Sequence, residues 1–93
     1  MIEKRLAELL GISLPQSIED IEEAMKQRGF AITIKRLPTR DNAYSCAFER
    51  AIYNEDRGQT EQQIFTGAGP NMKAAVKRAA YLTLTGKPWE GEA

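Results

Sequence analysis

The sequence predicts a small α+β domain, in which a three-stranded antiparallel sheet carries two principal helices on one face and an added helix precedes them. Three observations predict this class. Apolar residues recur at helical spacing within residues 2–10, 17–28 and 71–85. Between the last two segments, residues 30–37 and 44–53 alternate apolar and polar side chains, as strands with one buried face do. Glycine, proline and polar turn residues separate these segments.

The first expected helix belongs to residues 1–14 and is interpreted as an accessory element. Gly11 is well placed to end it in a left-handed conformation. The second helix, residues 17–28, has clearer ends, because Ser17 is a good N-cap and Gly29 supplies the stop. The apolar stripe of the first helix consists of Ile2, Leu6, Leu9 and Leu10.

Two strands are well defined by their alternation, and a third is weaker. The first ends at Pro38, and a polar turn leads to the second, where Arg50 interrupts the apolar side. The third is expected around residues 61–66, where Ile64 and Phe65 are the apolar members. The apolar faces of the first two strands consist of Phe30, Ile32, Ile34, Tyr44, Cys46, Phe48 and Ile52.

The last helix is expected to begin near Asn71, an N-cap residue type, and to stop at Gly86. Its many alanines would let the helix backbone approach the sheet closely. Lys73 and Lys77, four residues apart, are expected to share its outward side. The tail, residues 86–93, is polar apart from Trp89, which we expect to fold back over the helix ends. The inward stripe is expected to contain Met72, Ala75, Val76, Ala79 and Leu82 or Thr83.

Composition argues against an enzyme and against a cofactor. The 93 residues include no histidine, which removes the usual neutral-pH general base and most zinc sites. Cys46 is the single cysteine and is interpreted as a buried small hydrophobe rather than a reactive thiol. Neither a membrane-spanning run nor a secretion signal is recognisable, so the expected location is the cytoplasm.

Charge is balanced overall but not along the chain. Thirteen basic residues match thirteen acidic ones. Acidic residues are in excess over residues 1–29, and basic residues are in excess from residue 67 onward. Glu19, Glu22 and Glu23 are best explained by stabilisation of the helix dipole and by solubility, rather than as metal ligands or acid-base groups.

The order helix, strand, strand, strand, helix resembles that of the double-stranded-RNA-binding domain, and residues 17–85 carry the likeness. SIEDIEEAMKQRGF is similar to the first helix of that family. The family closes with the signature Gly-x-Gly-x-Ser-Lys-Lys-x-Ala-Lys-x-x-Ala-Ala-x-x-x-Leu. The matching residues here, without a gap, are Gly67, Gly69, Lys73, Ala75, Ala79, Ala80 and Leu84.

The resemblance implies a partner and a surface. In the family, a lysine cluster at the start of the last helix contacts phosphates of duplex RNA. Here Asn71 takes the place of the capping serine, while Met72 and Val76 replace two of the three lysines. The family's Gly-Pro-x-His element between the first two strands is absent, and this turn offers Arg40 instead. The candidate nucleic-acid-binding residues are therefore Lys73, Lys77, Arg78, Asn71 and Arg40.

Two functions remain open at this point. The first is a non-catalytic module that binds duplex nucleic acid weakly, RNA more readily than DNA, through the start of the last helix. The second is a protein-interaction module that has lost nucleic-acid binding and acts through a sheet edge or one of the first two helices. A compact, neutral chain of this size is also similar in style to accessory and inhibitor proteins of phages and mobile elements. Neither function requires a membrane or a small-molecule substrate.

Overall fold

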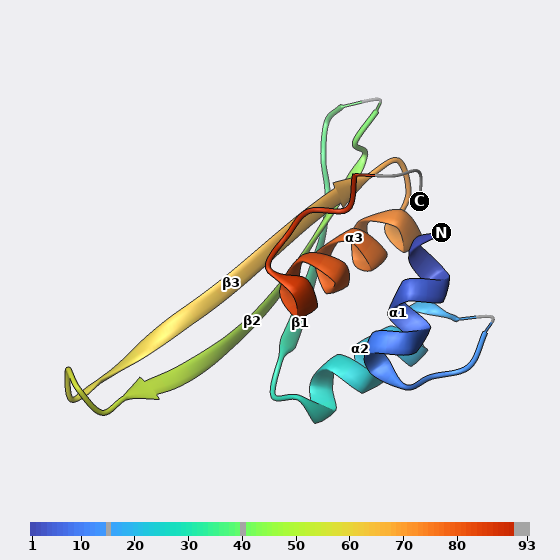
Figure 1. The fold of residues 1–93 in the computed structure, drawn as a ribbon. Coiled ribbons are helices and arrows are strands. Elements are labelled where there is room, and N and C mark those ends of the chain that lie inside the picture. The colour runs from blue at the N-terminus through green and yellow to red at the C-terminus, as the bar shows by residue number, and fades with distance from the viewer. Residues whose placement is uncertain (15, 40, 91–93) are drawn as a thin grey trace.

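A computed structural model describes residues 1–14, 16–39 and 41–90 of the chain. Its elements are α1 (Ile2–Leu10), α2 (Ile18–Gln27), β1 (Ala31–Arg36), β2 (Tyr44–Asn54), β3 (Gln59–Gly69) and α3 (Met72–Thr85). The strands form one antiparallel sheet in the order β1-β2-β3, and the helices gather on one side of it (Figure 1). This arrangement confirms the predicted α+β class, with its three-stranded antiparallel sheet and α-β-β-β-α order.

The ends of α2 and α3 follow from local side-chain chemistry. The Ser17 hydroxyl accepts from the Asp20 backbone N–H at 3.1 Å, while the Asp20 carboxylate accepts from the Ser17 N–H at 2.9 Å. This reciprocal capping box satisfies N–H groups that a helix start leaves unpaired. At the other end of the chain, α3 stops at Gly86, whose φ of 74° is readily adopted by glycine. Both helices therefore begin and end close to the predicted residues.

Helix α1 is a full part of the core, which corrects its interpretation as an accessory element. Its inward side chains, Ile2, Leu6 and Leu10, are buried together with residues of α2, α3 and the sheet. The buried Gln16 fastens this helix to the start of α2, because its Nε2 donates to the backbone carbonyl of Glu3 at 2.7 Å. Since α1 lies against α3, the first and last helices of the chain are neighbours (Figure 1).

Strand β3 is longer than the 61–66 predicted from its apolar residues. It runs from Gln59 to Gly69 and pairs with the whole of β2, so that Gly67 lies opposite Cys46 and Gly69 opposite Tyr44. The two glycines belong to the strand rather than to a loop before α3. Glycine in a strand often marks a close approach of another backbone, and the neighbour here is α3.

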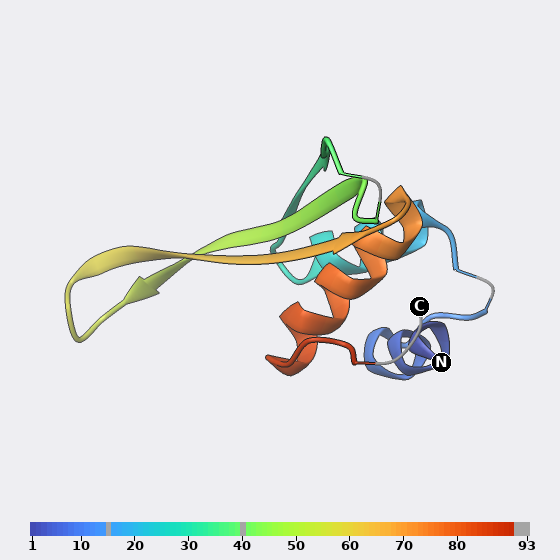
Figure 2. The ribbon, with the colours of Figure 1, turned by 90° about the horizontal axis from the view of Figure 1, so that it is seen from above.

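The distal halves of β2 and β3 form an arm that extends beyond the helices (Figure 2). The molecule is therefore 42 Å along its longest axis but only 22 Å along its shortest. At the root of the arm, the Arg50 guanidinium lies 4.5 Å from the centroid of the Phe30 ring and donates to the Gln63 side chain at 3.1 Å. At the tip, the Asn54 side chain accepts from the backbone N–H groups of Asp56 and Arg57.

Two predictions about single apolar residues have different outcomes. Trp89 packs partly buried against the core and lies edge-on to Tyr81 with ring centroids 5.0 Å apart, as expected of a tail that folds back. Met72, expected in the inward stripe of α3, is instead 39% exposed at the first helical position. The inward residues of α3 are small, which brings its axis close to the sheet and leaves no room beneath the first turn for a long side chain.

Cys46 is a free, fully buried cysteine, as its apolar neighbours predicted. Burial, together with the nearby Glu22 carboxylate, raises the pKa of its thiol to about 12. Because the thiolate is the nucleophile, we expect alkylation of folded protein near neutral pH to be slower than that of an exposed cysteine by on the order of a thousandfold. Iodoacetamide labelling followed by mass spectrometry measures this, with denatured protein as the control. Equal rates in the two states would contradict the burial of this thiol.

Candidate nucleic-acid interface

The start of α3 combines a capped helix end with one exposed lysine. The Asn71 side chain accepts a hydrogen bond from the Ala74 backbone N–H at 2.8 Å, so it acts as the predicted N-cap. Lys73 lies exposed in the first turn. The positive end of the helix dipole and the Lys73 ammonium group therefore face solvent at the same place, an arrangement that favours an anion.

The glycines before this helix serve packing. A Cβ atom added at Gly67 would lie 2.4 Å from the backbone nitrogen of Ala79, and one added at Gly69 would lie 2.7 Å from the Cβ of Ala74. Both distances are far below van der Waals contact. The pair of glycines thus lets α3 lie directly on β3, which accounts for them without any ligand.

Lys77 does not share the outward side of α3 with Lys73, and that expectation is wrong. Only 6% of its side chain is exposed, and its ammonium group forms an ion pair with the Glu3 carboxylate of α1. The hydrogen bond and charge of Lys77, with a further contribution from Lys73, lower the pKa of Glu3 despite its partial desolvation. Sequence reasoning missed this pair because it treated α1 as an accessory helix, whereas α1 covers this side of α3.

Arg78 is also engaged within the fold. Its guanidinium group donates from Nη1 to the backbone carbonyl of Ala68 in β3 at 2.9 Å. The residue is half-buried, with one part of its guanidinium fixed to the sheet. This contact was not predicted, because β3 was expected to end at residue 66.

The turn between β1 and β2 lies at the same end of the sheet as the start of α3. The register pairs Arg36 with Tyr44 and Tyr44 with Gly69, so the chain leaves β1 and enters α3 at neighbouring points. The turn is held by the Thr39 hydroxyl, which donates to the Asn42 carbonyl at 2.6 Å. Arg40, the remaining candidate, lies outside the described residues.

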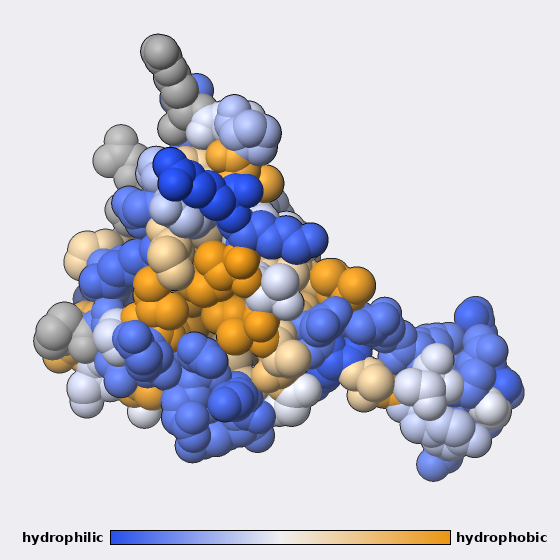
Figure 3. Space-filling view, turned by 180° about the vertical axis from the view of Figure 1, so that it is seen from behind, coloured by the Kyte–Doolittle hydropathy of each residue, from blue (hydrophilic) through white to orange (hydrophobic). Residues whose placement is uncertain are grey.

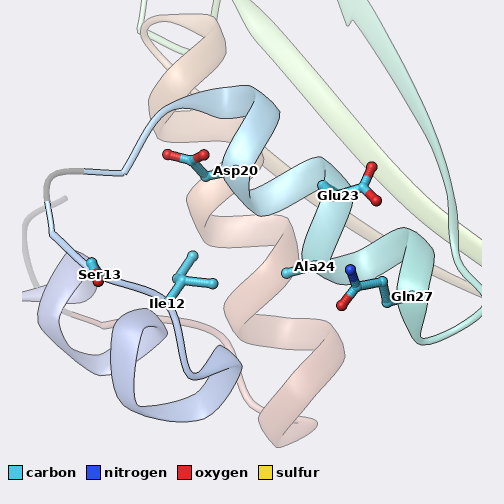
Figure 4. A pocket seen from close by; sticks show the side chains of 6 residues that line it. All are labelled: Ile12, Ser13, Asp20, Glu23, Ala24 and Gln27. Atoms are coloured by element: carbon cyan, nitrogen blue, oxygen red, sulfur yellow. The ribbon is translucent and has the colours of Figure 1, made fainter.

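A shallow groove lies between α2 and the segment that connects it to α1 (Figure 4). It encloses about 300 Å³, and its lining combines Ile12 and Ala24 with the carboxylates of Asp20 and Glu23. Hydrogen bonds from Ser17 hold the pKa of the Asp20 carboxyl below its ordinary value. Over residues 1–14, 16–39 and 41–90, no group of three or more acidic, cysteine or histidine side chains is placed to hold a metal ion.

Comparisons with known proteins do not identify a family. No family model matches the chain, and neither a curated protein nor a solved structure is significantly similar to it. Among the described helices, none is both long and apolar enough to cross a lipid bilayer. The likeness to double-stranded-RNA-binding domains therefore stands on the residues of the last helix and on the order of the elements.

Proposed function

We propose that this chain is a non-catalytic binding module that binds duplex nucleic acid weakly, RNA more readily than DNA. The contact surface is the end of the molecule formed by the β1–β2 turn and the start of α3, which we call the turn end. The observation that carries the proposal is the sheet register, which brings residue 36, residue 44 and residue 69 into one row beside exposed Lys73. Such a partner implies a cytoplasmic protein.

The charges predict weak, strongly salt-dependent binding. Lys77 and Arg78 have partners within the fold, so the proposed phosphate contacts come chiefly from Lys73 and from Arg40 of the turn. Asn71 contributes by orienting the helix end rather than by direct contact. Each phosphate neutralised contributes about 0.9 to the slope of log affinity against log salt concentration. Two or three contacts therefore give a slope of about −2 to −3, far smaller than that of a dedicated nucleic-acid-binding protein.

An NMR titration of labelled protein with a duplex RNA of about 16 base pairs tests the proposal. We expect shifts at residues 67–78 that fade as salt is raised, and smaller shifts with the matching DNA. Lys73→Glu should weaken binding by about tenfold or more, because it replaces an attraction with a repulsion. Lys87→Glu is the matched control, because it makes the same charge change beyond the other end of α3. An unmoved spectrum at low salt would refute nucleic-acid binding.

The second candidate function is a protein-interaction module of the kind carried by phages and mobile elements. The groove beside α2 favours it, because apolar Ile12 and Ala24 lie next to exposed carboxylates and suit a basic, amphipathic segment of a partner. The predicted alternative through the leucines of α1 loses its support, since Leu6 and Leu10 are buried. A lysine-rich amphipathic peptide should shift the resonances of Ile12 and Ala24, and Glu23→Lys should abolish those shifts. If the Glu23→Lys variant bound the peptide as well as the parent protein does, the groove would be excluded as the binding site.

A further inference from the structure

The outer edge of β1 carries unpaired backbone groups. In an antiparallel ladder, alternate residues turn their N–H and C=O groups to opposite sides of the strand. The Leu37 N–H donates to the Ala43 carbonyl at 2.6 Å, so residues of odd number face β2. Ile32, Ile34 and Arg36 therefore turn their backbone groups away from β2. Within the described residues, no strand pairs with this edge.

The opposite edge of the sheet is formed by β3, and one of its outward backbone groups has a partner within the fold. The same alternation turns the Ala68 carbonyl of β3 outward, and there it accepts the hydrogen bond from Arg78. Along the arm, Glu61 of this strand forms an ion pair with Arg57 at 3.2 Å, although Ile64 is exposed there as well. Edge strands are commonly blocked in such ways against pairing with other chains. In the part of the chain that the structure describes, no side chain hydrogen-bonds to the outward backbone groups of Ile32, Ile34 and Arg36 as Arg78 does to Ala68.

An apolar surface adjoins the free edge. Seen from behind, apolar atoms gather in the middle of the molecule, over β1 and α2 (Figure 3). The half-buried residues Ile32 and Ile34 of β1 and Ile18 of α2 pack there against the core and keep part of their surface in solvent. An extended partner at this edge would thus gain backbone hydrogen bonds and apolar contact together.

We propose that β1 pairs antiparallel with β1 of a second copy of this chain, about a two-fold axis that passes between the two Thr33 residues. In this register Ile32 of each copy lies opposite Ile34 of the other, and these are residues whose backbone groups face outward. The same side of both sheets then carries the helices, and the two apolar surfaces become continuous. The result is a six-stranded sheet whose outer edges are the two β3 strands.

The charges near the edge are complementary to those of a second copy in this orientation. Lys35 of one copy lies opposite Ala31 of the other, whose small side chain leaves the next residue in that row, Glu49, within reach. This opposite-charge relation across the strands favours the register over its shifted alternatives.

Position 33 provides a decisive test, because the axis places it opposite itself. Sedimentation velocity of the full chain at NMR concentrations should show a dimer. Thr33→Glu and Thr33→Lys are each expected to raise the dimer dissociation constant by about tenfold or more, because like charges would face each other at about 4.5 Å between Cα atoms. Mixing the two variants should restore dimerisation. Thr33 is exposed, so neither variant should disturb folding.

A cross-link gives a second, independent measurement. The expected separation of the two position-33 Cα atoms lies within the range of disulfides, so Thr33→Cys should form a covalent dimer under mild oxidation. Cys46 is buried and should not compete. The proposal is overturned if the unmodified chain sediments as a monomer. It is also overturned if neither charge variant changes the dimer dissociation constant, or if mixing the two variants does not restore dimerisation. Lys73→Glu should leave the dimer intact, which separates this test from that of nucleic-acid binding.

Discussion

Replacing Gly67 with alanine is expected to cost about 3 kcal/mol of unfolding free energy or more. The added methyl group would lie 2.4 Å from the nitrogen and 2.8 Å from the Cα of Ala79, and 2.9 Å from the carbonyl carbon of Arg78. All three atoms belong to the helix backbone, so no side-chain rotation can relieve the clash. α3 would have to move away from β3, which would loosen the contact of Ala75 and Ala79 with the sheet. Denaturant unfolding measures the loss.

Gly58→Ala is the matched control for this prediction. Gly58 lies at the tip of the arm with φ of 62°, and a Cβ there would meet no heavy atom within 4 Å. Its replacement costs about 1 kcal/mol through backbone strain alone. A loss at Gly67 no greater than that at Gly58 would show that the close approach of α3 to the sheet does not limit stability.

Replacing Glu3 with alanine is expected to cost about 3 kcal/mol, the second large effect. The change leaves the Lys77 ammonium group buried without its counterion, and removing one partner of a buried pair typically costs about 3–5 kcal/mol. We expect the lower end, because 27% of the Glu3 side chain is exposed and water can enter the vacated space. Thermal and denaturant unfolding check the value. Arg5→Ala, which breaks the exposed pair with Glu8 at 3.0 Å, is the control and should change stability by less than about 1 kcal/mol.

Lys77→Met tests whether the ion pair itself stabilises the fold. An apolar side chain of similar shape needs no counterion, and Glu3 keeps access to water, so we expect stability within about 1 kcal/mol of the parent protein.

The pH dependence of stability is expected to follow the same contact between Glu3 and Lys77. Because folding lowers the pKa of Glu3 from 4.5, its contribution is present above that pH and is lost as the pH falls through the folded value. Lys77→Met should therefore flatten the acid limb of the stability curve. If the stability of Lys77→Met fell as steeply at low pH as that of the parent protein, the ion pair with Glu3 would not be the source of the pH dependence.

Local signals were sufficient to predict most elements. Ser17 and Asn71 act as caps, and the alternation that starts at Phe30 gives β1 and β2 their buried face. Each of these features depends on residues a few positions apart in the chain. β3 was predicted too short, because Gly67 and Gly69 have no side chains to show alternation and are typical of turns.

The candidate site was harder to predict, because its residues are decided by distant contacts. Lys77 has the sequence spacing of an exposed residue, and only the docking of α1, whose Glu3 is 74 positions away, buries it. Arg78 likewise gains its partner from β3. Lys73 has the exposed position that the sequence predicted, and Asn71 the predicted capping role. The binding function itself stays a proposal.

The contact between α1 and α3 also constrains how the chain can fold as it leaves the ribosome. Residues of α1 are synthesised before those of α3, the helix that covers them, so the apolar stripe of Ile2, Leu6 and Leu10 stays uncovered until α3 has emerged. Ordering this non-local contact requires closing the segment between α1 and α3, which contains α2 and all three strands, into a loop. We therefore expect no fragment that contains α1 but lacks α3 to fold, and ribosome-bound chains to expose α1 to chaperones until α3 emerges.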